Sequence, residues 1–336
     1  MPNCPLCGSA SISNACRFST DAASAAQHFV LAEGDHTQHA KLAAHITALW
    51  NSPDCEMMSC NVCELSFAHP FVAGDAEFYN LAYPHSDYPT DKWEFSITAD
   101  ALAGSVTAGG RGLEIGSGFG YFLKQISPRF FTADRLVAIE YNDVAGKRLA
   151  EGGFEVVNQD IRSIAFCDLG FTFDFVFMFQ VLEHMDQLGL LAERLRMLTH
   201  KGTHIFIAVP NPERILFNER SGSLVDMPPN HISLWRKRTF EAFALQLECE
   251  VMDYQIEPMD WRRLIKQDLL YAYLRRAQVH RSWANRVRSM PRSGLRSIAE
   301  AMLALIWLPS RLPYWIKALK QGKTLGGSIW IHLRKK

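Results

Sequence analysis

The chain has 336 residues, 48% of them hydrophobic and 21% charged, which is enough for two or three folded units of ordinary soluble composition. Its net charge is zero, but the charges are unevenly distributed along the chain. Residues 261–336 contain 17 Lys and Arg and only two acids, Asp268 and Glu300, whereas the first 260 residues contain 18 Lys and Arg and 33 Asp and Glu. No basic and apolar leader opens the chain, and the longest apolar run, residues 301–308, is far shorter than the roughly 20 residues of a membrane-spanning helix. We therefore expect a cytoplasmic protein.

Two C-x-x-C pairs stand near the start of the chain, Cys4 with Cys7 and Cys60 with Cys63. Each short pair can occupy two corners of a tetrahedron, and in a reducing compartment this spacing is typical of zinc ligands. We predict a structural zinc ion held by these four thiolates. The alternative is that they are free cysteines with accidental spacing.

The chain between the two pairs is longer than in a minimal zinc ribbon. A helical pattern there places Leu42, Ile46 and Leu49 on one face, with Asp35 as a candidate N-cap. Four further cysteines are predicted to stay outside the metal site, two as spare thiols and two as buried residues near apolar strands: Cys16, Cys55, Cys167 and Cys249.

Aromatic residues follow the second pair, after Pro70: Phe78, Tyr79, Tyr83 and Tyr88. Together with the cysteine pairs, they resemble the zinc-binding N-terminal module that precedes the methyltransferase domain in sugar C-methyltransferases and their relatives. The resemblance covers about the first 90 residues and is loose between the pairs. It implies a module that shapes the protein, because four thiolates leave zinc no open position for chemistry. The tyrosines and Trp93 could form a lid over a cofactor, although such residues are more often core.

A glycine turn follows an apolar strand at residues 113–120, with the sequence Leu-Glu-Ile-Gly-Ser-Gly-Phe-Gly. Glycines permit positive φ and let backbone N–H groups approach a ligand, and a helix predicted from Tyr121 presents its N-terminus there. The dinucleotide fingerprint needs a glycine where this chain has Tyr121, and Glu114 suits a positively charged ligand better than a pyrophosphate. A tight turn without a ligand is the alternative.

The pattern E-x-G-x-G-x-G after a hydrophobic strand resembles the first motif of the class I S-adenosylmethionine-dependent methyltransferases. Apolar strands and helices alternate after it, which predicts an α/β fold with a parallel sheet. We predict strands at residues 111–115, 136–140, 154–158, 173–179, 203–209, 249–257 and 328–333, and helices at residues 121–127, 143–151, 187–198 and 240–247. The family implies a Rossmann-like sheet of seven strands whose last strand is antiparallel.

The resemblance also implies a cofactor-binding set for S-adenosyl-L-methionine: Glu114, Gly116, Gly118, Gly120, Glu140, Asp160, Ile161 and Gln180. Glu114 would meet the methionine ammonium above the three glycines. Glu140 would accept hydrogen bonds from the ribose, since two carboxylate oxygens match a vicinal diol. Asp160 would accept from the adenine amino group with Ile161 on the ring, and Gln180 would face the place where methionine and acceptor meet.

Residues 180–185, Gln-Val-Leu-Glu-His-Met, resemble the L-E-H segment of many small-molecule methyltransferases. Transfer from a sulfonium mainly requires a positioned acceptor and the removal of a proton. His184 is the predicted base, because imidazole titrates near neutral pH, and Glu183 would orient it or contact the cofactor. A histidine that only orders this loop is the alternative.

His231 is a second candidate for an acid, a base or a substrate contact. It lies in residues 227–235, a segment that resembles the P-P-x-H-x-x-x-[WF] loop of relatives, which commonly lines the acceptor pocket. A capping role near Ser233 is the alternative.

The basic segment, residues 260–324, is predicted to form two or more amphipathic helices. Aromatic and basic side chains stand together near its end: Trp307, Arg311, Tyr314, Trp315, Lys317 and Lys320. Such pairing is typical of a surface that binds an anionic membrane. An ordinary helical cap is one alternative. A nucleic-acid patch is another, although no nucleic-acid-binding motif accompanies the charge.

The sequence therefore predicts a zinc-binding module (residues 1–89), a methyltransferase core (90–259), the basic helical insertion (260–324) and a final core strand (325–336). The predicted activity is methyl transfer to oxygen or carbon of a small molecule, with a sugar or lipid-linked glycan intermediate as the favoured acceptor. Nucleic-acid methylation is disfavoured, because Asn211-Pro212 lacks the rest of the amino-methylating motif and no Pro-Cys pair is present. A nicotinamide-dependent oxidoreductase and a catalytically silent scaffold are the rival interpretations.

Overall fold

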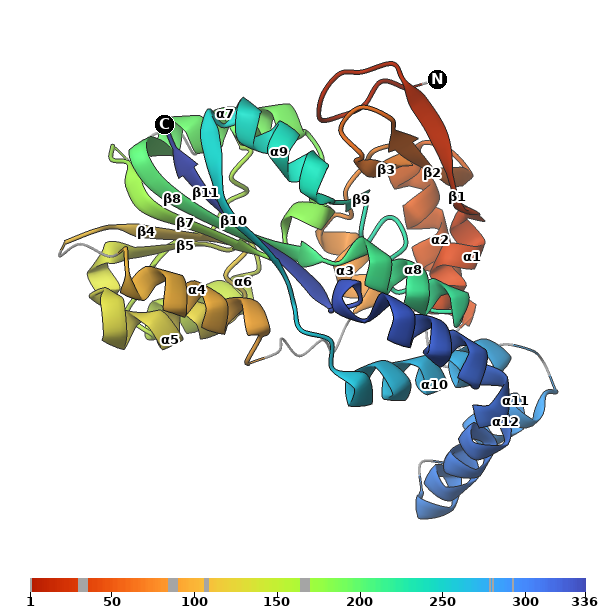
Figure 1. Cartoon of the computed structure of the whole chain (residues 1–336). Helices are drawn as coiled ribbons and strands as arrows, with labels where there is room; N and C mark the ends of the chain where they lie inside the picture. The colour runs from red at the N-terminus through yellow and green to blue at the C-terminus, as the bar shows by residue number, and fades with distance from the viewer. Residues whose placement is uncertain are drawn as a thin grey trace.

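The computed structural model describes residues 2–29, 36–83, 90–105, 109–163, 170–277, 279, 281–291 and 293–336. A seven-stranded sheet lies at its centre, in the order β10-β11-β8-β7-β4-β5-β6 (Figure 1). The strands are β4 (Gly112–Ile115), β5 (Leu136–Ile139), β6 (Glu155–Val157), β7 (Phe173–Phe179), β8 (Thr199–Pro210), β10 (Cys249–Ile256) and β11 (Ser328–Lys335).

The direction of the strands agrees with the predicted topology. β4 pairs in parallel with β5 and β7, β5 with β6, and β7 with β8. β11 runs antiparallel to both of its neighbours, β8 and β10. The predicted seven strands and the antiparallel last strand are therefore confirmed, although β8 begins at Thr199 and not at residue 203.

Helices cover both faces of this sheet (Figure 1). Phe175 and Phe177 of β7 pack among α4 (Trp93–Ala103), α5 (Tyr121–Phe130) and α6 (Asp143–Glu151). Val176 and Met178 point to the other face, where α7 (Leu188–Leu198) and α9 (Lys237–Gln246) lie. Successive side chains of a strand alternate between faces, so an almost continuous apolar strand is the expected product of a sheet buried on both sides.

A second sheet contains four strands in the order β1-β2-β3-β9. Three come from the start of the chain, β1 (Ile12–Asp21), β2 (Asp54–Cys60) and β3 (Ser66–His69), with α1 (Ala22–Phe29), α2 (His36–Trp50) and α3 (Ala76–Ala82) around them. The fourth strand, β9 (Ser233–Leu234), comes from the segment predicted as methyltransferase core. This sheet is therefore completed by residues far from the N-terminal 89.

The predicted helical face between the cysteine pairs lies on α2. Leu42 and Ile46 are completely buried and Leu49 is partly buried against the same cluster, as expected. Of the predicted cap and cysteines, Asp35 and Cys167 lie outside the described residues, and so does Tyr88. Cys249 is buried, as predicted, and Cys55 is buried as well.

Three helices form the basic segment: α10 (Trp261–Ala277), α11 (Trp283–Arg288) and α12 (Gly294–Gln321). The expected amphipathic helices are present, and α12 continues through Pro309 and Pro313 without interruption. In Figure 1 its N-terminal part, with α11, extends away from the sheet. Among the residues that the structure describes, no helix is long and apolar enough to cross a membrane.

The aromatic and basic side chains singled out near the end of α12 are largely engaged in internal contacts. Arg311 is buried and donates to both carboxylate oxygens of Asp268 on α10, and the indole of Trp315 donates to the same carboxylate at 2.8 Å. The guanidinium of Arg276 stacks 4.4 Å from the Trp307 ring. The large exposed side chains of α12 are mostly aliphatic: Leu295, Ile298, Met302, Leu305, Ile306, Leu312, Ile316 and Leu319.

Candidate active site

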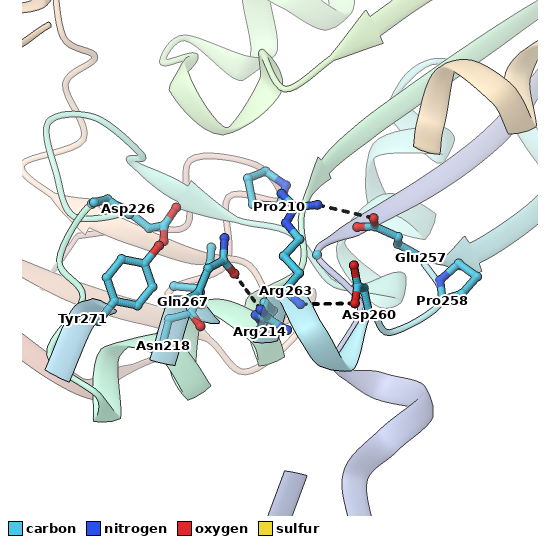
Figure 2. A pocket seen from close by; sticks show the side chains of 13 residues that line it. Pro210, Arg214, Asn218, Asp226, Glu257, Pro258, Asp260, Arg263, Gln267 and Tyr271 are labelled. Carbon is cyan, nitrogen blue, oxygen red and sulfur yellow. Dashed lines mark hydrogen bonds and ion pairs between the residues drawn. The ribbon is translucent and has the colours of Figure 1, made fainter. Parts of the chain in front are cut away.

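A pocket of ≈ 150 Å³ lies beyond the end of β8, between α8 (Pro212–Arg220) and α10 (Figure 2). Arg214 and Asn218 line it from α8, and Arg263, Gln267 and Tyr271 line it from α10. No helix was predicted between residues 210 and 239, so Arg214 and Asn218 of α8 were not identified from the sequence, whereas the α10 residues lie in the predicted basic helical segment. A start signal was present: the Asn211 side chain accepts from the Glu213 N–H, and Pro212 occupies the first turn.

The glycine turn connects β4 to α5. Gly116, Gly118 and Gly120 all have positive φ, at 72°, 52° and 70°. A Cβ added at Gly116 would lie 2.4 Å from Val181, and one at Gly120 would lie 2.3 Å from Leu149. Side chains are thus excluded by backbone conformation and by space, and the turn presents bare backbone at the N-terminus of α5.

Glu114 lies beside this turn with its side chain buried. Its Oε2 atom has no hydrogen-bond partner among the described residues. Burial raises the pKa of this carboxyl well above its usual range. An ammonium group placed against it would supply both the missing donor and a countercharge, so the site fits the positively charged end of S-adenosylmethionine.

Glu140 follows β5 and closes the other side of the turn. Its Oε2 accepts from the Gly118 N–H and its Oε1 from the Asn142 N–H, each at 2.8 Å. Burial raises the pKa of Glu140, although these backbone donors oppose the rise. The two bonds hold the carboxylate in one orientation, and each oxygen keeps a lone pair for a further donor such as a ribose hydroxyl.

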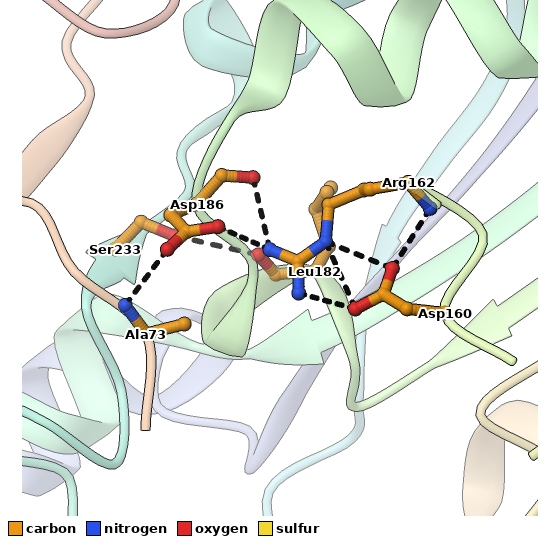
Figure 3. Close-up of polar contacts among 6 residues, drawn as sticks. All are labelled: Ala73, Asp160, Arg162, Leu182, Asp186 and Ser233. Carbon is orange, nitrogen blue, oxygen red and sulfur yellow. Dashed lines mark hydrogen bonds and ion pairs between the residues drawn. The ribbon is translucent and has the colours of Figure 1, made fainter. Parts of the chain in front are cut away.

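Asp160 forms an ion pair with Arg162 (Figure 3). Burial alone would raise the pKa of Asp160, but the Arg162 guanidinium and N–H lower it. Arg162 also reaches the carboxylate of Asp186, which accepts from the Ala73 N–H at 3.1 Å. The predicted adenine contact is thus already paired with Arg162, while Ile161 next to it is buried.

Gln180 ends β7 with a positive φ of 58°. Its amide donates to Oε1 of Glu94 at 2.9 Å and to Oγ of Ser328 at 3.2 Å. These bonds join α4, β7 and β11 at the same edge of the sheet. They fix Gln180, which was predicted to face the methionine part of the cofactor, at the carboxyl end of its strand. Ligands bind at this end of the strands in open α/β sheets.

His184 ends a short 3₁₀ turn, η3 (Leu182–His184). Its Nδ1 lies 2.7 Å from the Asn230 carbonyl oxygen and 2.9 Å from the Tyr79 hydroxyl. A carbonyl can only accept, so Nδ1 carries the hydrogen and Nε2 keeps the lone pair that a base needs. Burial and the neighbouring His231 lower the pKa of His184 to about 3.

Glu183 and His231 lie against His184. The two histidine rings are edge to face with centroids 4.6 Å apart, and Asp226 lies 3.0 Å from Nδ1 of His231. Both carboxylate oxygens of Glu183 are buried without a hydrogen-bond partner in the described part of the chain, and burial raises its pKa to about 7. The ligand atoms of the trio lie within 4.8 Å of one another, so these side chains could also hold a divalent cation.

The structure thus brings all three predicted catalytic residues together. Tyr79 joins them from the N-terminal part of the chain through its hydroxyl contact with His184, while a lid over the cofactor stays a prediction. Tyr83 instead stacks on Tyr79 and packs with Phe29 and Phe78, as a core residue does.

The four predicted metal ligands converge in the N-terminal part of the chain. The Cys4 and Cys63 sulfurs lie 3.6 Å apart, and so do those of Cys7 and Cys60. Four sulfurs at Zn–S distances of about 2.3 Å lie about 3.8 Å from one another in a tetrahedron. The cluster therefore has the donors and the size that a zinc ion requires.

Comparison with protein families matches residues 97–253 to a methyltransferase domain family. These residues form a methyltransferase domain. The matched segment contains the glycine turn, Glu140, Asp160, Gln180 and the trio around His184. It covers the region predicted as the core from Ile97 onward.

Several solved structures are similar to the chain. A SAM-dependent methyltransferase from Archaeoglobus fulgidus is 17% identical, with a TM-score of 0.42 and 78% of this chain and 100% of that chain covered. Coclaurine N-methyltransferase bound to N-methylheliamine and SAH is 15% identical, with a TM-score of 0.45 and coverage of 78% and 82%. Geranyl diphosphate C-methyltransferase from Streptomyces coelicolor A3(2) is 12% identical, with a TM-score of 0.40 and coverage of 72% and 79%. Comparison with curated proteins finds no match.

Proposed function

We propose that the protein is an S-adenosylmethionine-dependent methyltransferase that modifies oxygen or carbon of a small molecule, with a sugar or lipid-linked glycan as acceptor. The main support for this cofactor is the buried Glu114 carboxyl, whose Oε2 atom lacks a hydrogen-bond partner among the described residues. This carboxyl lies beside a turn that contains three glycines with positive φ. A carboxyl in that place suits an ammonium and opposes the pyrophosphate of a nicotinamide dinucleotide.

The cofactor, when bound, supplies a methyl group on a sulfonium that is already activated for displacement. Glu114 and Glu140 would orient it, and Gln180 would border the methyl-bearing end. His184 would take the acceptor proton at Nε2, because its Nδ1–H is fixed on the Asn230 carbonyl. His231 would disfavour the resulting imidazolium, because it lowers the pKa of His184, whereas the adjacent Glu183 would favour the imidazolium once ionised.

Calorimetric titration with S-adenosylhomocysteine should show tight binding to the wild-type protein and none to Gly118→Arg. Gly118 has positive φ and donates its N–H to Glu140, so a side chain there strains the turn and fills the cofactor path. Gly189→Arg is the matched control, because Gly189 is exposed on α7 with open space at its Cβ position. Binding of NADH in place of S-adenosylhomocysteine would reverse the assignment to an oxidoreductase.

The sugar acceptor is supported by the resemblance of residues 1–89 to the module of sugar C-methyltransferases, and we propose that this module binds structural zinc. The lipid part is supported by the charge of the basic helices. Of the two acids in residues 261–336, Asp268 pairs with Arg311 and Glu300 with Arg296. Residues 261–336 thus carry a large excess of basic side chains over acids, and α12 exposes aliphatic side chains, a combination that suits an anionic bilayer.

Sedimentation with liposomes should pull down the protein when the vesicles contain phosphatidylserine and leave it in solution with neutral phosphatidylcholine. Replacing Leu305 and Ile306, which are 66% and 67% exposed, by Ser should weaken binding because about 25 cal/mol per Å² of apolar burial is lost. Met197→Ser, at an exposed position on α7, serves as the control. Equal sedimentation with both lipids, or none with either, would remove the membrane from the proposal.

A further inference from the structure

The pocket between α8 and α10 has no role in cofactor binding as described above. Its polar lining comes from one face of each helix, since Arg214 and Asn218 are four residues apart on α8 and Arg263, Gln267 and Tyr271 are four apart on α10. Figure 2 shows these side chains around a common space. At about 30 Å³ per water molecule, a volume of ≈ 150 Å³ holds roughly five water molecules, so the pocket admits only a small ligand such as a single ring.

Two buried polar atoms of this pocket lack partners among the described residues: Nε of Arg214 and Oδ1 of Asn218. Arg214 is only 6% exposed and Asn218 only 7%. The remainder of the guanidinium is fixed, because Nη2 donates to Gln267 Oε1 at 2.6 Å and Nη1 donates to the Leu325 carbonyl at 3.3 Å. Two residues of the lining therefore carry one unused donor and one unused acceptor on adjacent turns of α8.

The unused Arg214 donor and Asn218 acceptor favour some kinds of ligand over others. An ionised carboxylate would satisfy the Arg214 donor but could not donate to Asn218, and a phosphate could donate only through a protonated oxygen, whereas a hydroxyl group both accepts and donates. An apolar ligand would leave both groups buried without partners. An array of hydroxyl groups is the chemistry that satisfies both.

The acids in the lining are already paired, and Glu257 lies 3.7 Å from Arg263 of the same lining. Glu257 accepts from the Ser328 N–H at 3.0 Å, and Asp260 accepts from the N–H groups at the start of α10. Asp226 lies beside His231. With three acids and two arginines around it, the pocket has no excess of positive charge, so a neutral ligand suits it better than a free anion.

Contacts join this pocket to the candidate active site on two sides. Asp226 lines the pocket and lies 3.0 Å from His231, whose ring packs on His184. Glu257 lines it and binds the backbone of Ser328, whose hydroxyl accepts from Gln180. A molecule in the pocket thus lies next to Asp226, which contacts the histidine pair, and next to Glu257, which is connected to Gln180 through Ser328.

We propose that this pocket binds the hydroxyl-rich ring of the acceptor, with Arg214 and Asn218 as the residues that select for it. The inference rests on the proposed methyltransferase function and assigns its acceptor subsite. The ring can come from a free sugar, a sugar phosphate or a lipid-linked glycan, since all present the same hydroxyl array.

Saturation-transfer NMR tests this with methyl α-D-glucoside, myo-inositol, glucose 1-phosphate and inorganic phosphate, each with and without S-adenosylhomocysteine. We expect transfer to the compounds with hydroxyl rings and none to inorganic phosphate. Asn218→Leu keeps the side-chain volume but removes the acceptor, and it should weaken ring binding about tenfold, the equivalent of about 1.4 kcal/mol. Tyr271→Phe gives a second variant that keeps the shape of the lining.

Gln255→Leu, at an exposed position on β10, is the matched control and should bind like the wild type. The proposal is overturned if no ring compound binds at tens of millimolar, if phosphate alone binds, or if Asn218→Leu and Tyr271→Phe both bind as well as the wild type. Calorimetry with S-adenosylhomocysteine on the same preparations separates the two proposals. A variant that binds cofactor but not ring supports the pocket, and a wild type that binds ring but no cofactor would contradict only the methyltransferase function.

Discussion

Replacing Cys63 with serine should release the zinc ion and unfold the N-terminal module. A structural zinc site contributes about 10–16 kcal/mol of apparent binding free energy, whereas whole domains are stable by only about 5–15 kcal/mol. Loss of one thiolate therefore removes more stability than the module is expected to hold in reserve. Metal content measured by mass spectrometry should fall from one ion per chain to none, and the thermal unfolding midpoint should fall sharply.

The effect should spread beyond the module, because the cysteines belong to the core of the main sheet. Cys4, Cys60 and Cys63 pack in the same cluster as Trp235 and Phe240. The Thr239 hydroxyl also donates to the Cys63 carbonyl at 2.9 Å. We therefore expect S-adenosylhomocysteine binding to weaken together with metal loss.

Cys55→Ser is the matched control for this experiment. Cys55 is also buried but is not one of the four converging cysteines, so serine there costs about 1–3 kcal/mol for a buried hydroxyl without loss of metal. Retention of the ion and of the unfolding midpoint in Cys63→Ser would contradict a four-thiolate structural site.

The main sheet could be predicted from the sequence because its strands carry their signals locally. Phe173–Phe179 is apolar at every position except Asp174, and its predicted bounds agree with the structure. Burial on both faces requires such a run, so period and composition alone identify the strand. The same reasoning placed α6, whose start is marked by the Asn142 cap.

The parts that were missed depend on contacts between distant segments. β9 has only two residues, and it is a strand only because β3 pairs with it. The contact between Tyr79 and His184 joins residues 105 apart in the chain, and no local pattern predicts it. Arg311 looked like a surface cation beside aromatic residues, but its partner Asp268 lies 43 positions away and holds it in the interior.

The sequence identified most residues of the candidate site but not the side chains to which they are hydrogen-bonded or ion-paired. The glycine turn and Glu114 follow from one short motif, whose backbone requirements are local. Asp160 was expected to face adenine, but its pairing with Arg162 depends on a loop that also reaches Asp186 and Ala73. α8 was missed, and with it the polar face that forms one wall of the pocket.

Replacing His184 with alanine should lower kcat by about 10²–10⁴-fold while the affinity for S-adenosylhomocysteine stays the same, once an acceptor is in hand. Nε2 carries the lone pair that would take the acceptor proton, whereas no cofactor residue hydrogen-bonds to this ring. His200→Ala is the matched control, because His200 is 43% exposed near the start of β8, away from the glycine turn. Equal kcat in the two variants would contradict a catalytic base at position 184.

The pH dependence tests whether His184 stays neutral in the folded protein, as a base at Nε2 requires. Burial and His231 lower the pKa of His184 to about 3, so the ring stays neutral in the folded protein well below its ordinary pKa of about 6.5. The rate should therefore persist into acid, with no loss from this group near pH 6.5. The unfolded chain takes up a proton there and the folded chain does not, so this group destabilises the fold progressively as the pH falls from about 6.5 toward 3.

Unfolding measured across that range should show a shallower acid loss of stability in His184→Ala than in the wild type. Tyr79→Phe removes only the hydroxyl contact at Nδ1, so it should leave the acid loss in place and reduce kcat by far less than His184→Ala. If His184→Ala lowers kcat without changing the acid side of the stability curve, the ring is protonated normally in the folded state. The low pKa of His184 would then be wrong, and so would the conclusion that the ring stays neutral between about pH 3 and 6.5.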